Sequence, residues 1–173
     1  MAEERSKTVE IIRRIGAPEL EKISITGILK SHELSFLLLK LSAADDPAAA
    51  VLTLLGTNGV NIRFITLYDD SPATRLLALC VESESLNASL ALLRSHQESL
   101  GIQNVSHHPR VRILSVYPYK ERAQVAERLL TSLRLSGVEP LAANNASSVL
   151  SCVLSSERFQ EALSCLDQVF ELP

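Results

Sequence analysis

The sequence predicts an α+β fold class, organised as two small units that each follow the element order βαββαβ. An internal repeat predicts the two units: residues 59–61 (Gly-Val-Asn) recur as residues 137–139 (Gly-Val-Glu), and residues 80–81 (Cys-Val) recur as residues 152–153. The period of roughly 75 residues is too long for a solenoid and suits a duplicated small domain. Hydrophobic residues form 46% of the chain and aromatic residues only 4%, so both cores are expected to be aliphatic.

The first unit is expected to span residues 31–109. Its first helix begins with Pro47, a residue that the first helical turn tolerates, and ends at Gly59. Alternating apolar positions predict the strands, and a turn that contains Pro72 separates two of them. In chain order, the expected elements are strand 35–42, helix 47–55, strand 61–68, turn 69–72, strand 75–82, helix 86–100 and strand 103–107.

The second unit repeats this order but lacks a last strand of its own. Its expected elements are strand 111–117, helix 120–135, strand 141–145, strand 148–154 and helix 158–169. A vacant place in this sheet would expose an unpaired edge beside apolar surface. Residues 23–30 are an unassigned segment with apolar alternation at Ile23, Ile25 and Leu29. We therefore expect residues 23–30 and 110–173 to form the second unit together, with the first unit inserted into it.

Residues 1–22 are expected to form an N-terminal amphipathic helix and a linker. Residues 7–15 place apolar side chains on one helical face, and Gly16 and Pro18 follow them as helix-ending residues. Because an exposed apolar face is unfavourable in water, this helix is expected to cover another surface.

Charge and hydropathy argue against two classes of partner. The net charge is −3 and Lys and Arg form no stripe with interleaved aromatic residues, so nucleic-acid binding is not expected. Apolar stretches such as residues 51–55 are far shorter than the roughly 20 residues that span a bilayer, so no membrane insertion is expected. The charged N-terminus favours a cytoplasmic location. Cys80, Cys152 and Cys165 match no zinc or redox spacing and are expected to be small buried side chains.

Three short segments carry a family resemblance. They are Ile-Thr-Gly-Ile at residues 25–28, Gly-Val-Asn-Ile at residues 59–62, and Phe-Glu-Leu-Pro at residues 170–173, the last following Ala162-Leu163. In this order and spacing, the chain resembles the C-terminal regulatory region of aspartokinases, which is built from tandem ACT domains, over roughly residues 23–173. The resemblance implies two ferredoxin-like units threaded into one another, with the Ile-Thr-Gly strand serving the second sheet.

The same resemblance implies a regulatory function. A module of this kind senses a free amino acid, such as lysine, threonine or methionine, and alters a catalytic kinase partner. It also implies a homodimer, because ACT units of this family pair side by side. The six glycines form no nucleotide-binding loop, so the chain is not expected to be an enzyme by itself. No cofactor or metal is expected, since His107 and His108 are adjacent and adjacent strand residues point to opposite faces.

A free amino acid needs hydrogen-bond donors for its carboxylate and acceptors for its ammonium group. The loop that enters the helix at Pro47 offers backbone donors, and its aspartates offer acceptors. The amide side chain of Asn61 adds both capacities. The expected ligand-binding residues are Asp45, Asp46, Pro47, Ala48, Asn61 and Ile62.

Two departures from the family pattern favour an alternative function. The family usually has Pro-Gly in the entry loop, where glycine lets the backbone approach the ligand, but this chain has Pro47-Ala48. The second unit has Glu139 at the asparagine position, so no second site is expected. Asp46 also has a purely structural alternative as a helix cap. The alternative function is therefore a dimerisation or protein-interaction module of the ACT type that has lost ligand binding.

Overall fold

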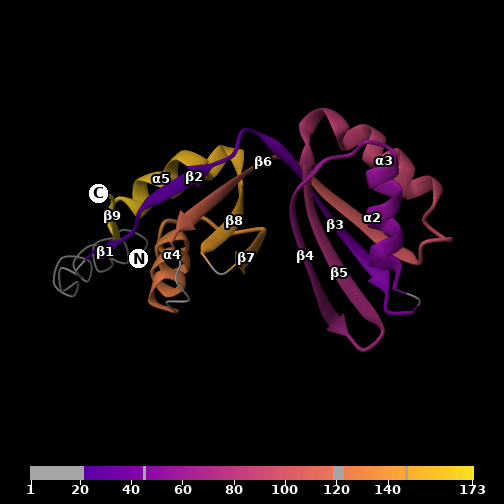
Figure 1. Ribbon diagram of the computed structural model, residues 1–173, viewed down its shortest axis with the longest axis horizontal. Coiled ribbons are helices and arrows are strands. Elements are labelled where there is room, and N and C mark those ends of the chain that lie inside the picture. Colours follow the sequence, from indigo (N-terminus) through magenta and orange to yellow (C-terminus); the bar gives the residue numbers. More distant parts are fainter. Residues whose placement is uncertain (1–21, 45, 119–122, 147) are drawn as a thin grey trace, which may run out of the picture.

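The computed structural model describes residues 22–44, 46–118, 123–146 and 148–173, and the fold is α+β. The strands are β1 (Ile23–Ser24), β2 (Gly27–Lys30), β3 (Leu34–Ser42), β4 (Ile62–Ser71), β5 (Thr74–Glu82), β6 (Ile102–Tyr117), β7 (Ala142–Ala146), β8 (Val149–Ser155) and β9 (Phe170–Glu171). The described helices are α2 (Pro47–Thr57), α3 (Leu86–Ser95), α4 (Ala123–Leu135) and α5 (Phe159–Leu166). Figure 1 shows an elongated molecule with helices at both ends and β6 running between them.

The first group of elements consists of β3, α2, β4, β5, α3 and the first part of β6, in chain order. Its strands lie in the order β4-β5-β3-β6. Helices α2 and α3 lie together over one face of this sheet (Figure 1). The core between the helices and the sheet is aliphatic, as the composition predicts. Its fully buried members are Leu37, Leu39, Leu41, Val51, Leu55, Leu77, Leu79, Val81 and Leu93.

The second group uses the last part of β6, followed by α4, β7, β8 and α5. Here β6 pairs with β8 on one side and with β2 on the other. The pairing with β2 is antiparallel and runs from Gly27 opposite Tyr117 to Lys30 opposite Leu114. This pairing confirms that the upstream segment supplies a strand to this sheet. Ile25 is 2% exposed and belongs to the same core as Leu114 and Val116. The segment that we expected to be one strand is two, because β1 leaves this sheet and pairs in parallel with β9.

A second correction concerns β6, which is one continuous strand where two separate strands were expected. Pro109 lies inside it, although proline cannot donate a ladder hydrogen bond. The register of β6 against β3 shifts at this point: Leu34 lies opposite Val111, whereas Phe36 lies opposite His108. The irregularity accommodates the proline. The hydroxyl of Ser35 donates to the Pro109 carbonyl at 3.0 Å.

A third core, made by the sheet face opposite α2 and α3, connects the two groups. It consists of the buried residues Leu34, Phe36, Phe64, Ala78, Cys80, Val111 and Val153, and of these Val153 lies in β8. The outermost strands of the sheet also meet, because the Asn144 amide of β7 donates to the Ile65 carbonyl of β4 at 3.1 Å. The two groups therefore share packing as well as β6.

Smaller differences affect where helices end. Helix α3 stops at Ser95 rather than near residue 100, and α5 stops at Leu166, because the following residues turn toward β6 and β9. The predicted N-terminal helix falls outside the described residues. The three cysteines are buried as predicted, and burial raises the pKa of both Cys80 and Cys152 to about 12. Within the described ranges, we found no helix long and apolar enough to cross a membrane.

Candidate functional site

The entry to α2 holds the first half of the predicted ligand site. Asp46 precedes the helix in a left-handed conformation (φ 47°) and makes no side-chain cap hydrogen bond. Its carboxylate oxygen lies 3.3 Å from a guanidinium nitrogen of Arg75, and the same guanidinium lies 2.9 Å from Asp69. Asp45 lies outside the described residues. Asp46 is thus an exposed acceptor that already has a cationic neighbour within the chain.

Pro47 and Ala48 are buried in the first turn of α2, so their side chains serve packing rather than ligand contact. Ala48 is 3% exposed and belongs to the core beneath the helix. What this turn offers a ligand is backbone. The first N–H groups of a helix have no partner within it, and Pro47 has no N–H, so the first donor is that of Ala48.

The second half of the predicted site lies at the other end of the same sheet. Asn61 is exposed just before β4, and Ile62, half-buried, begins that strand opposite Val81. The α2 entry instead follows the end of β3, where Ser42 lies opposite Thr74. Helix α2, at about 1.5 Å per residue over 11 residues, separates the two positions by roughly 16 Å. Within one chain, Asp46 and Asn61 therefore do not converge.

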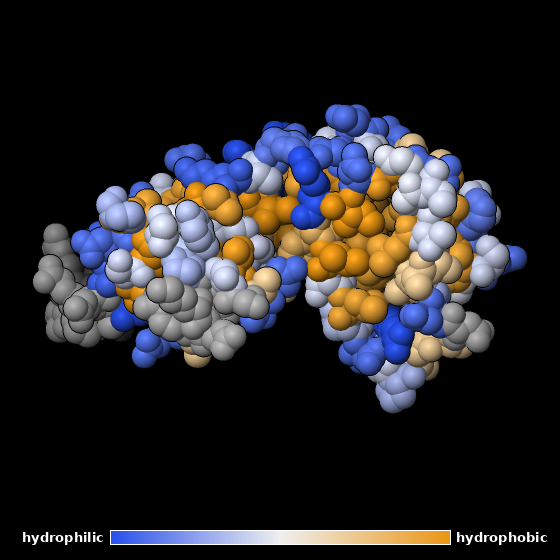
Figure 2. Space-filling view, viewed as in Figure 1, coloured by the Kyte–Doolittle hydropathy of each residue, from blue (hydrophilic) through white to orange (hydrophobic). Residues whose placement is uncertain are grey.

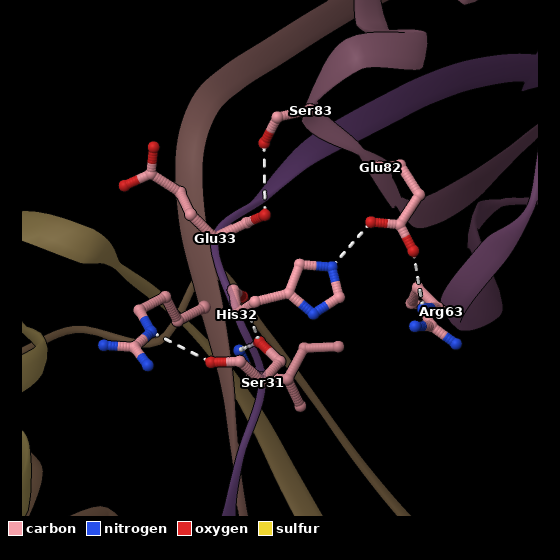
Figure 3. Close-up of polar contacts among 8 residues, drawn as sticks. Ser31, His32, Glu33, Arg63, Glu82 and Ser83 are labelled. Carbon is pink, nitrogen blue, oxygen red and sulfur yellow. Dashed lines mark hydrogen bonds and ion pairs between the residues drawn. The ribbon is translucent and has the colours of Figure 1, made fainter.

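A polar cluster that the sequence did not predict lies where the chain passes from β2 to β3 (Figure 3). Glu82, at the end of β5, is its centre: one carboxylate oxygen lies 2.6 Å from His32 Nε2 and the other lies 2.8 Å from Arg63 Nε. The Ser83 hydroxyl donates to the Glu33 carbonyl at 3.2 Å. These contacts attach the connecting residues to the first group.

The same connecting residues are also attached to the second group. The Ile113 N–H of β6 donates to the Ser31 hydroxyl at 2.8 Å, and Arg112 Nε donates to the Ser31 carbonyl at 3.0 Å. Arg112 itself stacks over the Phe159 ring at 4.3 Å. The connection between the groups is therefore a hydrogen-bonded segment rather than a free linker.

The electrostatics of the cluster favour an ionised glutamate. The hydrogen bond from His32 is the largest cause that lowers the pKa of Glu82 below its ordinary value of 4.5, and the charges of His32 and Arg63 act in the same direction. By residue type alone, a glutamate at the end of a strand is typical of a solvated surface position. The register between two strands could have revealed its role. Glu82 lies opposite Leu34, and Leu34 follows His32 by two residues, so the pairing of β5 with β3 brings Glu82 close to His32.

We expect Glu82→Gln to lower the free energy of unfolding at neutral pH by about 1 kcal/mol or less, the usual range for ion pairs with exposed partners. Because the pKa of Glu82 is lowered in the folded state, its ionised form stabilises the fold above the unfolded-state pKa, and this contribution is lost as the pH falls through the lowered value. The difference between wild type and variant should therefore shrink below about pH 4. Urea unfolding at several pH values measures it, and a difference that persists unchanged in acid would contradict the assignment.

Comparison with known proteins identifies solved structures that have a similar architecture. The sequence matches no protein-family model and no curated protein. The structure is similar to the ligand-free regulatory subunit of aspartate kinase from Thermus thermophilus, with a TM-score of 0.75 and 17% identity over 85% of this chain and 99% of that chain. The chain has the fold of an aspartate kinase regulatory subunit. The regulatory subunit of aspartate kinase from Thermus flavus is also similar, with a TM-score of 0.77 and 17% identity, covering 85% of this chain and 99% of that one.

The aspartate kinase regulatory fold also occurs within a longer chain. The aspartate kinase from Synechocystis matches with a TM-score of 0.77 and 14% identity over 86% of this chain, but over only 28% of the kinase chain. The prediction of a tandem regulatory fold resembling that of aspartokinases is thereby confirmed at the level of architecture. The match covers 99% of each Thermus regulatory subunit chain.

Proposed function

We propose that this chain is an allosteric regulatory module that binds a free amino acid and acts on a catalytic kinase partner. The observation that carries the proposal is its match to nearly the whole length of regulatory subunits that form separate chains.

The proposed domain division follows the strand orders. Residues 31–109 form one ferredoxin-like βαββαβ unit, with its strands in the order β4-β5-β3-β6. Residues 23–30 and 110–173 form the second, in which β2 takes the place of the last strand and the order is β7-β8-β6-β2. The first unit is thus inserted into the second.

The proposed effector site requires two copies of the chain. Because Asp46 and Asn61 lie at opposite ends of the first sheet, a second copy packed antiparallel along β4 would bring Asn61 of one copy near the α2 entry of the other. Strand β4 is an outermost strand of the sheet, and of its backbone carbonyls that of Ile65 already accepts a hydrogen bond from Asn144 of β7. In this homodimer, Asp46 and the backbone of Pro47 and Ala48 come from one copy, and Asn61 and the backbone of Ile62 from its partner. Lysine, threonine and methionine are the proposed effectors.

Thermal unfolding against the twenty amino acids tests this function. A ligand at a hundred times its dissociation constant stabilises the native state by about 2.7 kcal/mol, which raises the melting temperature by roughly 5 to 10 °C for a chain of this size. We expect such a shift with one or two amino acids, and its loss in Asn61→Ala. Asn104→Ala, which removes another exposed asparagine outside the site, is the matched control. No shift with any amino acid at about 10 mM would contradict ligand sensing.

The second candidate function, dimerisation or protein interaction without a ligand, is favoured by the surface of β4. Three of its large side chains are exposed: Ile65 by 44%, Leu67 by 45% and Tyr68 by 48%. Ala48 is buried at the position where the family has glycine, and this difference also favours a function without a ligand. A dimer in light scattering, together with no thermal shift from any amino acid, would select this function over the first.

A further inference from the structure

Helix α2 ends in a hydrogen-bonded turn that places an asparagine directly before a glycine. Asn58 follows the helix with φ −97° and ψ 16°, and Gly59 comes next in the left-handed conformation at φ 74°. The Gly59 N–H donates to the Gly56 carbonyl at 3.0 Å. The Val60 N–H donates to the Leu55 carbonyl, also at 3.0 Å. Together these two bonds form a Schellman motif, which requires the left-handed conformation at the glycine position.

The same two residues can react with one another. Of the six asparagines in the chain, Asn58 alone precedes a glycine. The backbone nitrogen of the following residue can close a five-membered ring on the side-chain carbonyl carbon of an asparagine, and glycine hinders this closure least because it has no Cβ. Asn58 and Gly59 are both exposed, and the surface over the end of α2, at the upper right of Figure 2, is pale rather than apolar. Water therefore reaches the pair.

Two hydrogen bonds hold the pair in an unreactive arrangement. Asn58 Nδ2 donates to the Leu54 carbonyl at 2.8 Å, so the side-chain amide is turned back toward the helix. The Gly59 nitrogen must lose its proton before it attacks, but its N–H is donated to the Gly56 carbonyl, an acceptor that does not take up the proton as a base would. Ring closure therefore requires the last turn of α2 to open, and element ends are where local opening costs least.

We propose that Asn58-Gly59 is a site of spontaneous deamidation that is controlled by opening of the C-terminal turn of α2. The Gly59 nitrogen forms a bond to the side-chain carbonyl carbon of Asn58, and the bond from that carbon to Nδ2 breaks. Ammonia leaves and carries away the proton of the Gly59 nitrogen. Water then opens the cyclic imide at one of its two carbonyls and gives either aspartate or isoaspartate at position 58. Water is the only co-reactant, and nothing is oxidised or reduced.

Either product disrupts the end of α2. An ionised aspartate has no N–H to donate to the Leu54 carbonyl, and its charge lies beside the carbonyl end of the helix, where anions are unfavourable. Isoaspartate lengthens the main chain before Gly59 and so breaks the spacing of the Schellman motif. The modification goes beyond the proposed function. Only one consequence rests on that function, namely that a disturbed turn displaces Asn61 and weakens the binding of an amino acid.

Incubation of the full chain in heavy-oxygen water at neutral pH tests the inference, because the product keeps an oxygen atom from the solvent. Mass spectrometry of proteolytic peptides then measures the reaction rate at each asparagine. We expect Asn58 to react before the other asparagines, and at least about tenfold more slowly in the folded chain than in guanidinium chloride. Earlier reaction at another asparagine, or equal rates at Asn58 in the folded and unfolded chains, would overturn the inference.

Gly56→Ala tests whether the end of α2 controls the reaction. Gly56 lies within the last turn of the helix, and no atom lies within 4 Å of the place that a Cβ would take. Alanine favours the helix over glycine, so the folded chain should react about two- to fivefold more slowly. Gln124→Ala, at an exposed position of α4, is the matched control and should leave the rate unchanged. An unchanged rate in Gly56→Ala would overturn the inference.

Ile25→Val separates local opening from unfolding of the whole chain. Ile25 packs in the core of the second group, which contains no residue of α2, and the substitution removes part of one buried side chain. The melting temperature should fall, whereas the rate at Asn58 should stay within about twofold of the wild type, because the turn of α2 opens as before. A rate that rises in step with the loss of global stability would overturn the proposed control by α2.

Discussion

Ile25→Ala is expected to lower the free energy of unfolding by about 2 to 5 kcal/mol, the usual cost of deleting a buried aliphatic side chain. Ile25 is 2% exposed and packs in a core with Leu114, Leu166 and Phe170, although all three lie far away in sequence. The substitution therefore leaves a cavity in the second group rather than near its own neighbours in the chain. Urea unfolding followed by circular dichroism measures the loss.

The location of the effect matters as much as its size. Hydrogen exchange should show reduced protection in β8 and α5 of Ile25→Ala, because these elements pack in the same core. Thr26→Ala, at the exposed neighbouring position, is the control and should change stability by about 0.5 kcal/mol or less. A cost for Ile25→Ala as small as that of the control would show that this segment is not seated in the second group.

Phe36→Ala should have an effect of similar or greater size, about 3 to 5 kcal/mol. Phe36 is 2% exposed within the third core, which joins β3, β4 and β5 to Val153 of β8. Its ring also lies beside His108, with 6.4 Å between the ring centroids. Because this core is common to both groups, the loss should lower the stability of both, and unfolding should remain a single transition. Differential scanning calorimetry measures both properties.

Tyr68→Ala is the matched control, because Tyr68 is an aromatic residue of β4 that is 48% exposed. It should cost less than about 1 kcal/mol. If Phe36→Ala instead unfolds in two steps, and one of these steps occurs at the melting temperature of the wild type, then the third core does not couple the groups.

Much of the fold could be predicted from sequence because periodicity and turn residues report local structure. The apolar alternation of residues 23–30 and the count of strands predicted that β2 would join the second sheet, and the pairing of Lys30 with Leu114 confirms it. The continuity of β6 was missed because Pro109 is a strong local signal for a break. Whether proline interrupts a strand depends on the partner strand, here the shifted register of β3.

The candidate site was less predictable, for a similar reason. Residue type and spacing pointed to Asp46 and Asn61, but their separation follows from strand direction, since β3 and β4 each pair antiparallel with β5 and so run in the same direction. The cluster around Glu82 depends on side chains from three segments that are distant in sequence. The cluster contains one histidine, one arginine and one glutamate. This combination occurs on many ordinary protein surfaces, so it forms no motif that could be recognised in the sequence.

The arrangement of β2, β3 and β6 affects how such a gene can be rearranged. The chain enters the first group at Leu34 and leaves it near Val111, and these two residues are paired neighbours. A segment whose two ends lie side by side can be exchanged for another closed segment without displacing what flanks it. A single breakpoint anywhere between β2 and β6 would instead separate these two strands, which pair with each other although the first group lies between them in sequence. Recombination should therefore replace the first group whole, while the second is inherited as two pieces that must stay together.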